Sequence, residues 1–358
     1  MTDQFDRWVE DTDRAIASAL EAQSRAGAVL GAVSGELLEP LHDISSGGKR
    51  VRALLLLAAH DAFGGTQDRS ATSVAAALEL FQTAALVHDD VLDGSDTRRG
   101  RPSTHRRVES LHREQGWHGD SAEYGEAGAV LGGDLALMCC QRALSDAVLD
   151  RPRAVAQTVS RLFLDMADIV TLGQYADMRA AAAPIAGLGD QEQEIRSVMR
   201  AKTASYTAEF PLGLGAALAG ADPEGVDAMR RAGLSLGHAF QLRDDLLGLT
   251  GSSAATGKPT GDDVREGKRT LVMWRAWRGT DDQGRIVIGD ALGVRNASDQ
   301  AVARVLDVVH STDAIAWSEE EIARAADEAR RSLSEQQLTP RGLAALESLI
   351  TRAVDRVA

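Results

Sequence analysis

The sequence predicts an all-α protein, on the evidence of its composition and of the spacing of its apolar residues. Of 358 residues only 8 are proline and 4% are aromatic, whereas Ala, Leu, Val, Glu and Arg recur throughout. Alanine and straight-chain residues lose little conformational entropy in a helix, and a β-sandwich or barrel would need more β-branched and aromatic side chains. Apolar residues also recur with the period of a helix along most of the chain.

The N-terminal part of the chain carries three segments with this period, and each is predicted to form one helix. They span Gln4–Leu41, Arg50–Phe63 and Val74–Asp93. The stretch SSGG at 45–48 separates the first from the second, and Gly94–Pro102 follows the third. Glycine and serine favour turns over helix interiors, so these stretches are expected to be loops.

The rest of the chain continues the helical pattern. A last helix is expected to begin at Pro340, with Thr339 as its N-cap. The predicted helices here are Ala127–Asp150, Arg153–Met178, Gln191–Leu218, Asp222–Gly248, Lys268–Trp277, Asp299–His310, Ser318–Ser334 and Pro340–Val357. The predicted connections are Glu114–Gly125, Gly251–Gly267 and Gly279–Asn296. No repeat and no long polar linker divides the chain, so residues 1–358 are predicted to form a single domain.

Several classes of protein are disfavoured by charge and composition. A net charge of −14 argues against nucleic acids or anionic membranes as the main partner. No apolar run is long enough to span a bilayer, and the polar, acidic start MTDQFDRWVEDTDR is unlike a signal peptide. Adjacent Cys139 and Cys140 offer neither a disulfide framework nor metal-ligand spacing. A cytoplasmic protein without stable membrane insertion is therefore expected.

An acidic motif, DDVLD, ends the predicted helix Val74–Asp93. Asp89 and Asp93 are four residues apart, so their carboxylates share one helix face about 6 Å apart along the axis. Asp90 points roughly 100° away from that face. Two carboxylates on one face suit a hard cation such as Mg²⁺, which also binds substrate phosphates. A solvated acidic helix end is the alternative interpretation.

Basic residues stand next to the acidic ones. RRGR at 98–101 follows DDVLD, and guanidinium groups suit phosphate oxygens, although a surface salt-bridge patch is the alternative. A second acidic pair, Asp244-Asp245, ends another apolar helix, with Gly248 where DDxxD would have its last carboxylate. The following stretch GKPTGDDVREGKR, at 257–269, mixes both charges on a Gly-rich segment. Without a bound ligand this stretch would be a charge-balanced surface loop.

Three weaker signals complete the pattern. GGKRVR at 47–52 places Lys49 and Arg52 on one face of a helix N-terminus, which suits anions but lacks P-loop spacing. GQYAD at 173–177 and KT at 202–203 taken singly are best explained as buried polar pairs. Together the motifs indicate a polyanionic substrate bridged by divalent metals. No Ser-His-Asp order, HExxH or Rossmann glycine pattern offers a competing chemistry.

Over about residues 40 to 275, these ordered motifs resemble the trans-type prenyl diphosphate synthases, enzymes of isoprenoid biosynthesis. The resemblance implies an antiparallel helical bundle around a deep central cavity, usually as a homodimer. It implies a Mg²⁺-dependent prenyltransferase that condenses isopentenyl diphosphate with an allylic diphosphate. About three Mg²⁺ ions are implied per active site. The alternatives are a class I terpene cyclase, which would carry a different second metal motif, and a catalytically silent regulatory subunit, which would have lost an aspartate motif.

The resemblance also implies a role for individual residues. The metal ligands are Asp89, Asp93 and Asp244. The allylic diphosphate is contacted by Arg98, Lys202, Thr203, Gln241, Lys258 and Lys268. Isopentenyl diphosphate is held by Lys49, Arg52, Gln82 and Arg99. Asp89, Asp93, Arg98, Lys202 and Asp244 form the catalytic set. Many bacterial relatives have His in place of Gln82, which can donate the same kind of hydrogen bond.

Product length is predicted from the helix that precedes Asp89. The growing chain should run from the diphosphate towards the helix N-terminus, past Ala84 and Ala85, which are too small to block it. Phe81 is the first large side chain able to stop the chain, about 12 Å from Asp89 at the helical rise. Geranylgeranyl diphosphate, with twenty carbons, is therefore the expected product, and the farnesyl and longer products are the neighbouring alternatives.

Overall fold

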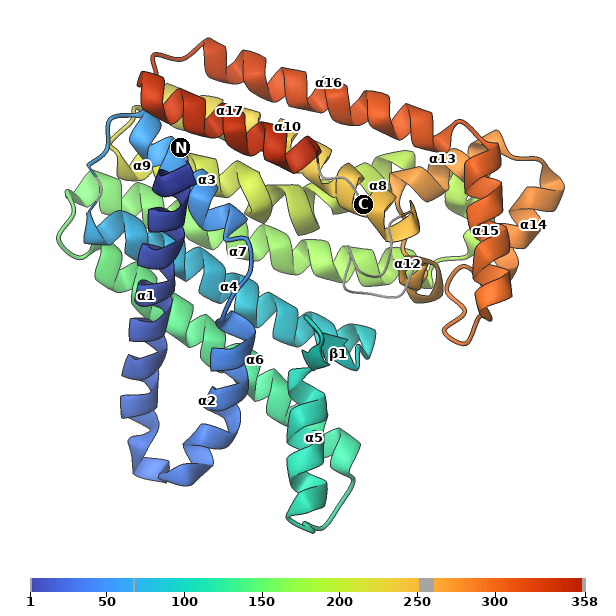
Figure 1. Ribbon diagram of the computed structural model, residues 1–358, viewed down its shortest axis with the longest axis horizontal. Coiled ribbons are helices and arrows are strands. Elements are labelled where there is room, and N and C mark those ends of the chain that lie inside the picture. The colour runs from blue at the N-terminus through green and yellow to red at the C-terminus, as the bar shows by residue number, and fades with distance from the viewer. Residues whose placement is uncertain (1, 67, 251–260, 356–358) are drawn as a thin grey trace. The chain divides into compact units, whose positions relative to one another are not determined.

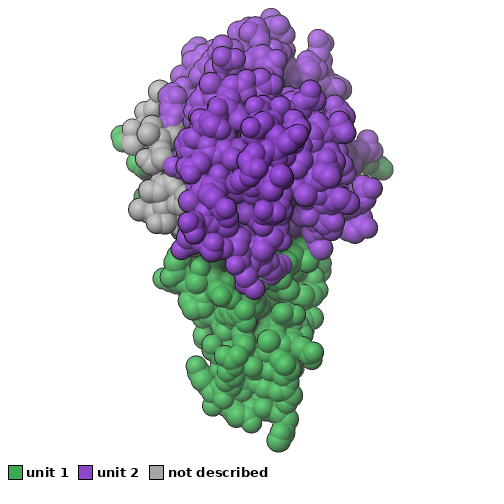
Figure 2. All heavy atoms as spheres, turned by 90° about the vertical axis from the view of Figure 1, so that its right-hand side faces the viewer, with its two compact units in different colours: residues 1–61, 65–160 green, residues 62–64, 161–358 purple. Residues whose placement is uncertain are grey.

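The protein was analysed as a computed structural model that describes residues 2–66, 68–250 and 261–355. The predicted all-α fold is confirmed, because the described elements are helices apart from one short hairpin (Figure 1). The hairpin pairs β1 (Thr97–Arg98) with β2 (Arg101–Pro102). The chain divides into two compact units, residues 1–61 with 65–160 and residues 62–64 with 161–358, coloured separately in Figure 2. A single-domain organisation stays a prediction beside this division.

The first unit is built around helix α4, which packs against α6 and α1. Its core includes Leu41, Ala84, Val87 and Ala129, and the small alanines let α4 and α6 lie close together. The elements here are α1 (Thr2–Gly27), η1 (Ala28–Leu30), α2 (Ala32–Ser45), α3 (Val51–Ala62), α4 (Arg69–Asp93), α5 (Thr104–Glu114) and α6 (Ser121–Val148). Helix α7 (Arg153–Ala182) begins in this unit and continues into the second.

Among the described residues, α4 is the helix long and apolar enough to cross a bilayer, and 67% of its apolar window is buried inside the structure. Burial of this kind is typical of the core helix of a soluble protein.

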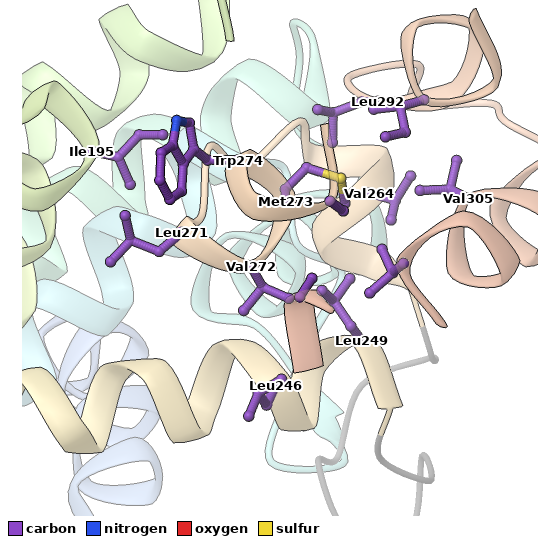
Figure 3. Packing of buried hydrophobic residues seen from close by; sticks show 14 of the residues in the cluster. Ile195, Leu246, Leu249, Val264, Leu271, Val272, Met273, Trp274, Leu292 and Val305 are labelled. Atoms are coloured by element: carbon purple, nitrogen blue, oxygen red, sulfur yellow. The ribbon is translucent and has the colours of Figure 1, made fainter. Parts of the chain in front are cut away.

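The second unit is built around helix α10, which packs against η3, α9, α16 and α17. Leu246 and Leu249 of α10 contribute to the cluster of buried side chains in Figure 3, together with Val264, Val272 and Val305. The elements are η2 (Ile185–Asp190), α8 (Glu192–Met199), η3 (Arg200–Glu209), α9 (Phe210–Leu218), α10 (Pro223–Thr250), α12 (Asp262–Glu266), α13 (Leu271–Gly279), α14 (Asp282–Ala291), α15 (Asp299–Ser311), α16 (Ala314–Ser334) and α17 (Pro340–Val354).

Several predicted boundaries are wrong. The connection expected at Glu114–Gly125 includes the start of α6 at Ser121, and the one expected at Gly251–Gly267 includes the short helix α12. The helix expected at Gln4–Leu41 is broken, because Gly31 takes a φ of 58° and turns the chain between α1 and α2. The connection expected at Gly279–Asn296 contains helix α14, whose N-cap Asp281 accepts a hydrogen bond from the N–H of Gly284. The N-cap predicted at Thr339 is confirmed by the same kind of bond to Gly342.

Candidate active site

The first acidic motif lies at the C-terminal end of α4. The helix stops at Gly94, which takes the left-handed conformation with a φ of 66°, directly after Asp93. Asp89 and Asp93 are half-buried, whereas Asp90 is fully buried with 0% of its surface exposed. The three carboxylates therefore have different surroundings, and the pair at 89 and 93 is the partly exposed one.

Asp90 forms a buried ion pair with Arg98 of the hairpin. Nε of Arg98 donates to Oδ1 of Asp90 at 2.8 Å, and a second guanidinium N–H donates to the same oxygen. Burial raises the pKa of Asp90 above its usual range, although the bond from Arg98 acts in the opposite direction. A main-chain hydrogen bond also holds this segment, because the N–H of Ser95 donates to the carbonyl of Asp90 at 2.9 Å. Asp90 thus holds Arg98 rather than sharing the face of Asp89 and Asp93.

A basic pocket of about 210 Å³ lies between the hairpin and the loop that follows α2. Arg98 and Arg99 line it together with Gly47 and Gly48. Arg99 donates at 3.0 Å to the carbonyls of Ile44 and Ser46, which joins the hairpin to the loop. Guanidinium groups beside an exposed Gly-rich backbone form a concave surface suited to phosphate oxygens.

Sequence reasoning missed Arg50, which lies between the predicted ligands Lys49 and Arg52. Its side chain is 4% exposed and forms ion pairs with Asp13 at 2.7 Å and with Glu79 at 3.5 Å. Its guanidinium also donates to the carbonyl of Ser45 at 2.7 Å, and its φ is 49°. Arg50 therefore fixes the loop while Lys49 is exposed. No local sequence pattern predicts that Arg50 fixes the loop, because its partners Asp13 and Glu79 are distant in sequence.

Gln82 lies on α4 two turns before Asp89. Its amide oxygen is buried and has no hydrogen-bond partner among the described residues. A buried polar atom without a partner commonly marks a place where a ligand or water binds. This observation fits the predicted contact of Gln82 with isopentenyl diphosphate.

The residues predicted to set product length differ in their burial. Ala84 packs into the core cluster with Leu41 and Ala129, and Phe81 is 5% exposed. Ala85 is half-buried, four residues before Asp89 and therefore on nearly the same helix face. Ala85 is the more direct candidate for the wall along which a growing chain would lie.

In the second unit, Lys202 lies in η3, a π-helical segment. π-Helices are rare and often occur at functional sites. Nζ of Lys202 donates to Oδ2 of Asp177 at 2.5 Å, which joins the KT and GQYAD motifs. Gly173 of α7 and Gly237 of α10 let these helices approach the η3 backbone, because a Cβ at either position would overlap it. Thr203, the next residue, is half-buried.

The second acidic motif ends α10. Asp244 is half-buried, whereas Asp245 is buried and accepts a hydrogen bond from the amide of Gln241 at 2.6 Å. Burial, reinforced by the charge of Asp263, raises the pKa of Asp245 to about 7. Asp244 is therefore the partly exposed carboxylate of this motif. The predicted ligand Lys258 lies outside the described residues.

Lys268 follows the short helix α12. Its ammonium donates to Asp263 at 2.7 Å and pairs with Glu266 at 2.9 Å. Burial alone would lower the pKa of Lys268, but the two carboxylates raise it well above its usual value.

Within the described part of the chain, no group of three or more His, Cys, Asp or Glu side chains is positioned to hold a metal ion. A metal ion bound at either aspartate motif would need further ligands, such as phosphate oxygens and water.

The sequence model of the polyprenyl synthetase family matches residues 34–309. The chain belongs to the polyprenyl synthetase family. It is 32% identical to a geranylgeranyl diphosphate synthase of Sulfolobus acidocaldarius over 75% of this chain and 74% of the relative. It is 30% identical to an all-trans-nonaprenyl-diphosphate synthase of Rhodobacter capsulatus over 88% of this chain and 87% of the relative.

A solved structure extends the similarity to the whole polyprenyl synthetase fold. The geranylgeranyl pyrophosphate synthase of Corynebacterium glutamicum, solved with isoprenyl diphosphate and magnesium, shares 33% identity and a TM-score of 0.91. The alignment covers 99% of both chains. Relatives named for short and for long products are about equally similar to this chain.

Proposed function

We propose that this polyprenyl synthetase is a Mg²⁺-dependent prenyltransferase that joins isopentenyl diphosphate to allylic diphosphates. One observation carries the proposal: the partly exposed carboxylates of Asp89 and Asp93 lie at the end of the same helix whose Asp90 holds Arg98 in the basic pocket. Paired carboxylates together with guanidinium groups suit a metal diphosphate and suit few other ligands.

The donor set fits magnesium. Asp89, Asp93 and Asp244 are half-buried carboxylates, hard oxygen ligands of the kind that Mg²⁺ accepts alongside substrate phosphates. When bound, about three ions would neutralise the negative charge that develops on the departing diphosphate. We infer that Asp89 and Asp93 hold two of them and Asp244 the third.

The basic side chains would bind and orient the two substrates. Arg98, Lys202, Thr203, Gln241, Lys258 and Lys268 would hold the allylic diphosphate, and Lys49, Arg52, Gln82 and Arg99 the isopentenyl diphosphate. The fixed positive charge of Arg98 and Lys202 would stabilise the diphosphate as its bond to the allylic carbon breaks. The alkene of isopentenyl diphosphate then attacks that carbon and forms the new C–C bond. The released diphosphate accepts the proton that the isopentenyl unit loses. Asp90 would take no part in proton transfer, because it is buried in its ion pair with Arg98.

We further propose that the product is geranylgeranyl diphosphate and that the enzyme is a homodimer. The half-buried Ala85 on the Asp89 face supports passage of a fifteen-carbon chain, and Phe81 is the first large side chain beyond it. Exposed apolar side chains on α6, Leu131 at 57% and Met138 at 59%, support a subunit contact, since they are seven residues apart on one face.

The test is incubation of the purified protein with isopentenyl diphosphate, each allylic primer and Mg²⁺, followed by chromatography of the products. A prenyltransferase lengthens the primer and releases diphosphate. A terpene cyclase would instead give a hydrocarbon or alcohol from the allylic substrate alone, and a silent subunit would give no product. Light scattering of the same sample measures the oligomeric state.

A further inference from the structure

Arg269, the residue after Lys268, is a buried cation with no role in the site described above. Its side chain is 8% exposed. Among the described residues no carboxylate pairs with it, and burial lowers the pKa of Arg269 below its usual value. Its Nη1 is also buried, without a hydrogen-bond partner in the described part of the chain. Burying a guanidinium charge and leaving a buried donor unpaired both cost free energy, so a gain in stability does not explain this residue.

The other N–H groups of Arg269 bind the C-terminal end of α7. Nε donates to the carbonyl of Ala180 at 3.3 Å, and Nη2 donates to the carbonyl of Ala183 at 2.8 Å. Helix α7 ends at Ala182, and the last carbonyls of a helix lack partners further along the helix. A cation at this position also interacts favourably with the negative end of the helix dipole. Arg269 thus joins the segment that follows α12 to the end of α7.

This end of α7 carries part of the proposed diphosphate site. Asp177 lies three residues before Ala180, about one helical turn away and on the same side of the helix. Asp177 accepts the hydrogen bond from Nζ of Lys202. Arg269 is therefore bonded to α7 one turn from the Asp177–Lys202 pair, and its neighbour in the sequence is Lys268.

The main chain around Arg269 is fixed on both sides. Before Arg269, the N–H of Lys268 donates to a carbonyl of α12 at 3.0 Å. After it, Nε1 of Trp274 in α13 donates to the carbonyl of Gly189 in η2 at 3.1 Å. Trp274 and Leu271 also belong to the buried cluster of Figure 3. The bonds of Arg269 to α7 therefore add to a segment that already has little freedom to shift.

We propose that Arg269 is a positioning residue that holds Lys268 at a fixed place relative to Lys202, so that both ammonium groups can bind one diphosphate. The proposal rests on the proposed function, since it takes the two lysines as ligands of the allylic diphosphate. Two cations held in place before the ligand arrives bind it more tightly than two that must be ordered on binding. Arg269 acts through Lys268 and is not itself a ligand.

The test replaces Arg269 by methionine, which is apolar and of similar length. Calorimetry with inorganic diphosphate and Mg²⁺ should show an affinity about 10-fold below that of the native protein, and the KM for the allylic substrate should rise by about the same factor. The KM for isopentenyl diphosphate should stay within about 2-fold of native. The melting temperature of the metal-free protein should change by less than about 3 °C, because removal of a buried charge offsets the loss of two hydrogen bonds.

Two further variants separate positioning from a general effect of the substitution. When Arg269→Met is added to Lys268→Ala, the affinity for diphosphate should fall by less than about 2-fold more, since Arg269 acts through the residue already removed. Arg269→Lys keeps the positive charge but has one amino group where the guanidinium reaches two carbonyls. Its affinity should lie between those of the native protein and Arg269→Met, and this variant tests the same point should Arg269→Met not fold.

Arg278→Ala is the matched control. Arg278 is exposed on α13, and its guanidinium donates to the carbonyl of Gly189 at 3.5 Å. Its loss therefore removes another arginine bonded to the main chain near the end of α7. We expect Arg278→Ala to bind diphosphate within about 2-fold of native, as for a surface substitution.

The proposal is overturned if Arg269→Met binds diphosphate as tightly as the native protein, or if its effect is undiminished in the Lys268→Ala background. A lower melting temperature with unchanged affinity would also overturn it, because the role of Arg269 would then be purely structural. A native protein that binds diphosphate but lengthens no primer would overturn the proposed function, while the calorimetric comparison would still test Arg269.

Discussion

Asp89 and Asp90 are adjacent in the first acidic motif, yet their replacement should have different consequences. Asp90 is 0% exposed and pairs with Arg98, whose side chain is 18% exposed. Removing one partner of a buried ion pair typically costs about 3–5 kcal/mol. Arg98 lines the basic pocket and can regain solvent, and burial already disfavours the Asp90 carboxylate. Both effects reduce the cost, so we expect Asp90→Ala to lower the free energy of unfolding by about 2 kcal/mol.

Asp89→Ala should cost less than about 1 kcal/mol, because a half-buried carboxylate at a helix end contributes little to stability. Its effect should be on turnover, which we expect to fall by several orders of magnitude with Mg²⁺ present. Asp90→Ala should instead raise the KM for the allylic substrate, since Arg98 is no longer held.

Urea denaturation of the metal-free proteins, followed by circular dichroism, measures the difference in stability, and steady-state kinetics measures the rest. Equal losses of stability in the two variants would refute the assignment of Asp90 as the buried partner of Arg98. Near-normal turnover of Asp89→Ala would refute the metal assignment.

Three further predictions concern substrate binding, product length and the protonation of Asp245. Arg52→Ala should raise the KM for isopentenyl diphosphate far more than the KM for the primer. Equal increases of the two KM values would contradict the assignment of Arg52 to isopentenyl diphosphate. Ala85→Phe should shorten the product and Phe81→Ala should lengthen it, as measured by chromatography. Ala84→Phe should mainly destabilise the core, by about 1–3 kcal/mol, through overpacking. An unchanged chain length in the first two variants would show that the α4 face carrying Phe81 and Ala85 does not line the cavity. Because the pKa of Asp245 is raised from 3.8 to about 7, the folded protein retains a proton that the unfolded chain releases between these pH values. The free energy of unfolding should therefore fall as pH rises through this window, by about 1.4 kcal/mol per pKa unit. Asp245→Asn should flatten that slope in melting curves from pH 5 to 8, and a slope equal to that of the native protein would contradict the shift.

The sequence predicted what depends on local pattern. The helix α4 and the shared face of Asp89 and Asp93 follow from apolar periodicity and four-residue spacing, and the structure has both. Helix α14 was missed because Gly284 and Gly289 resemble loop residues, whereas the Asp281 cap starts a helix there. Glycine weakens a helix by only about 1 kcal/mol, which a cap can offset.

Contacts between distant residues could not be predicted from the sequence. Asp90 and Arg98 are separated by a turn, and Asp263 reaches Gly248 only because α12 folds back onto α10. The ion pairs of Arg50 join three separate segments of the first unit. Each of these contacts depends on tertiary packing, so a motif shows which residue types are present but not which of them bind a ligand and which hold a neighbour.

The proposed reaction of this polyprenyl synthetase elongates an allylic diphosphate with isopentenyl diphosphate to twenty carbons. The most direct measurement is product analysis with labelled isopentenyl diphosphate and dimethylallyl, geranyl or farnesyl diphosphate, with Mg²⁺ and with the metal chelated. We expect geranylgeranyl diphosphate from all three primers and no product when the metal is removed. Failure to lengthen any primer, or undiminished condensation with the metal chelated, would contradict it.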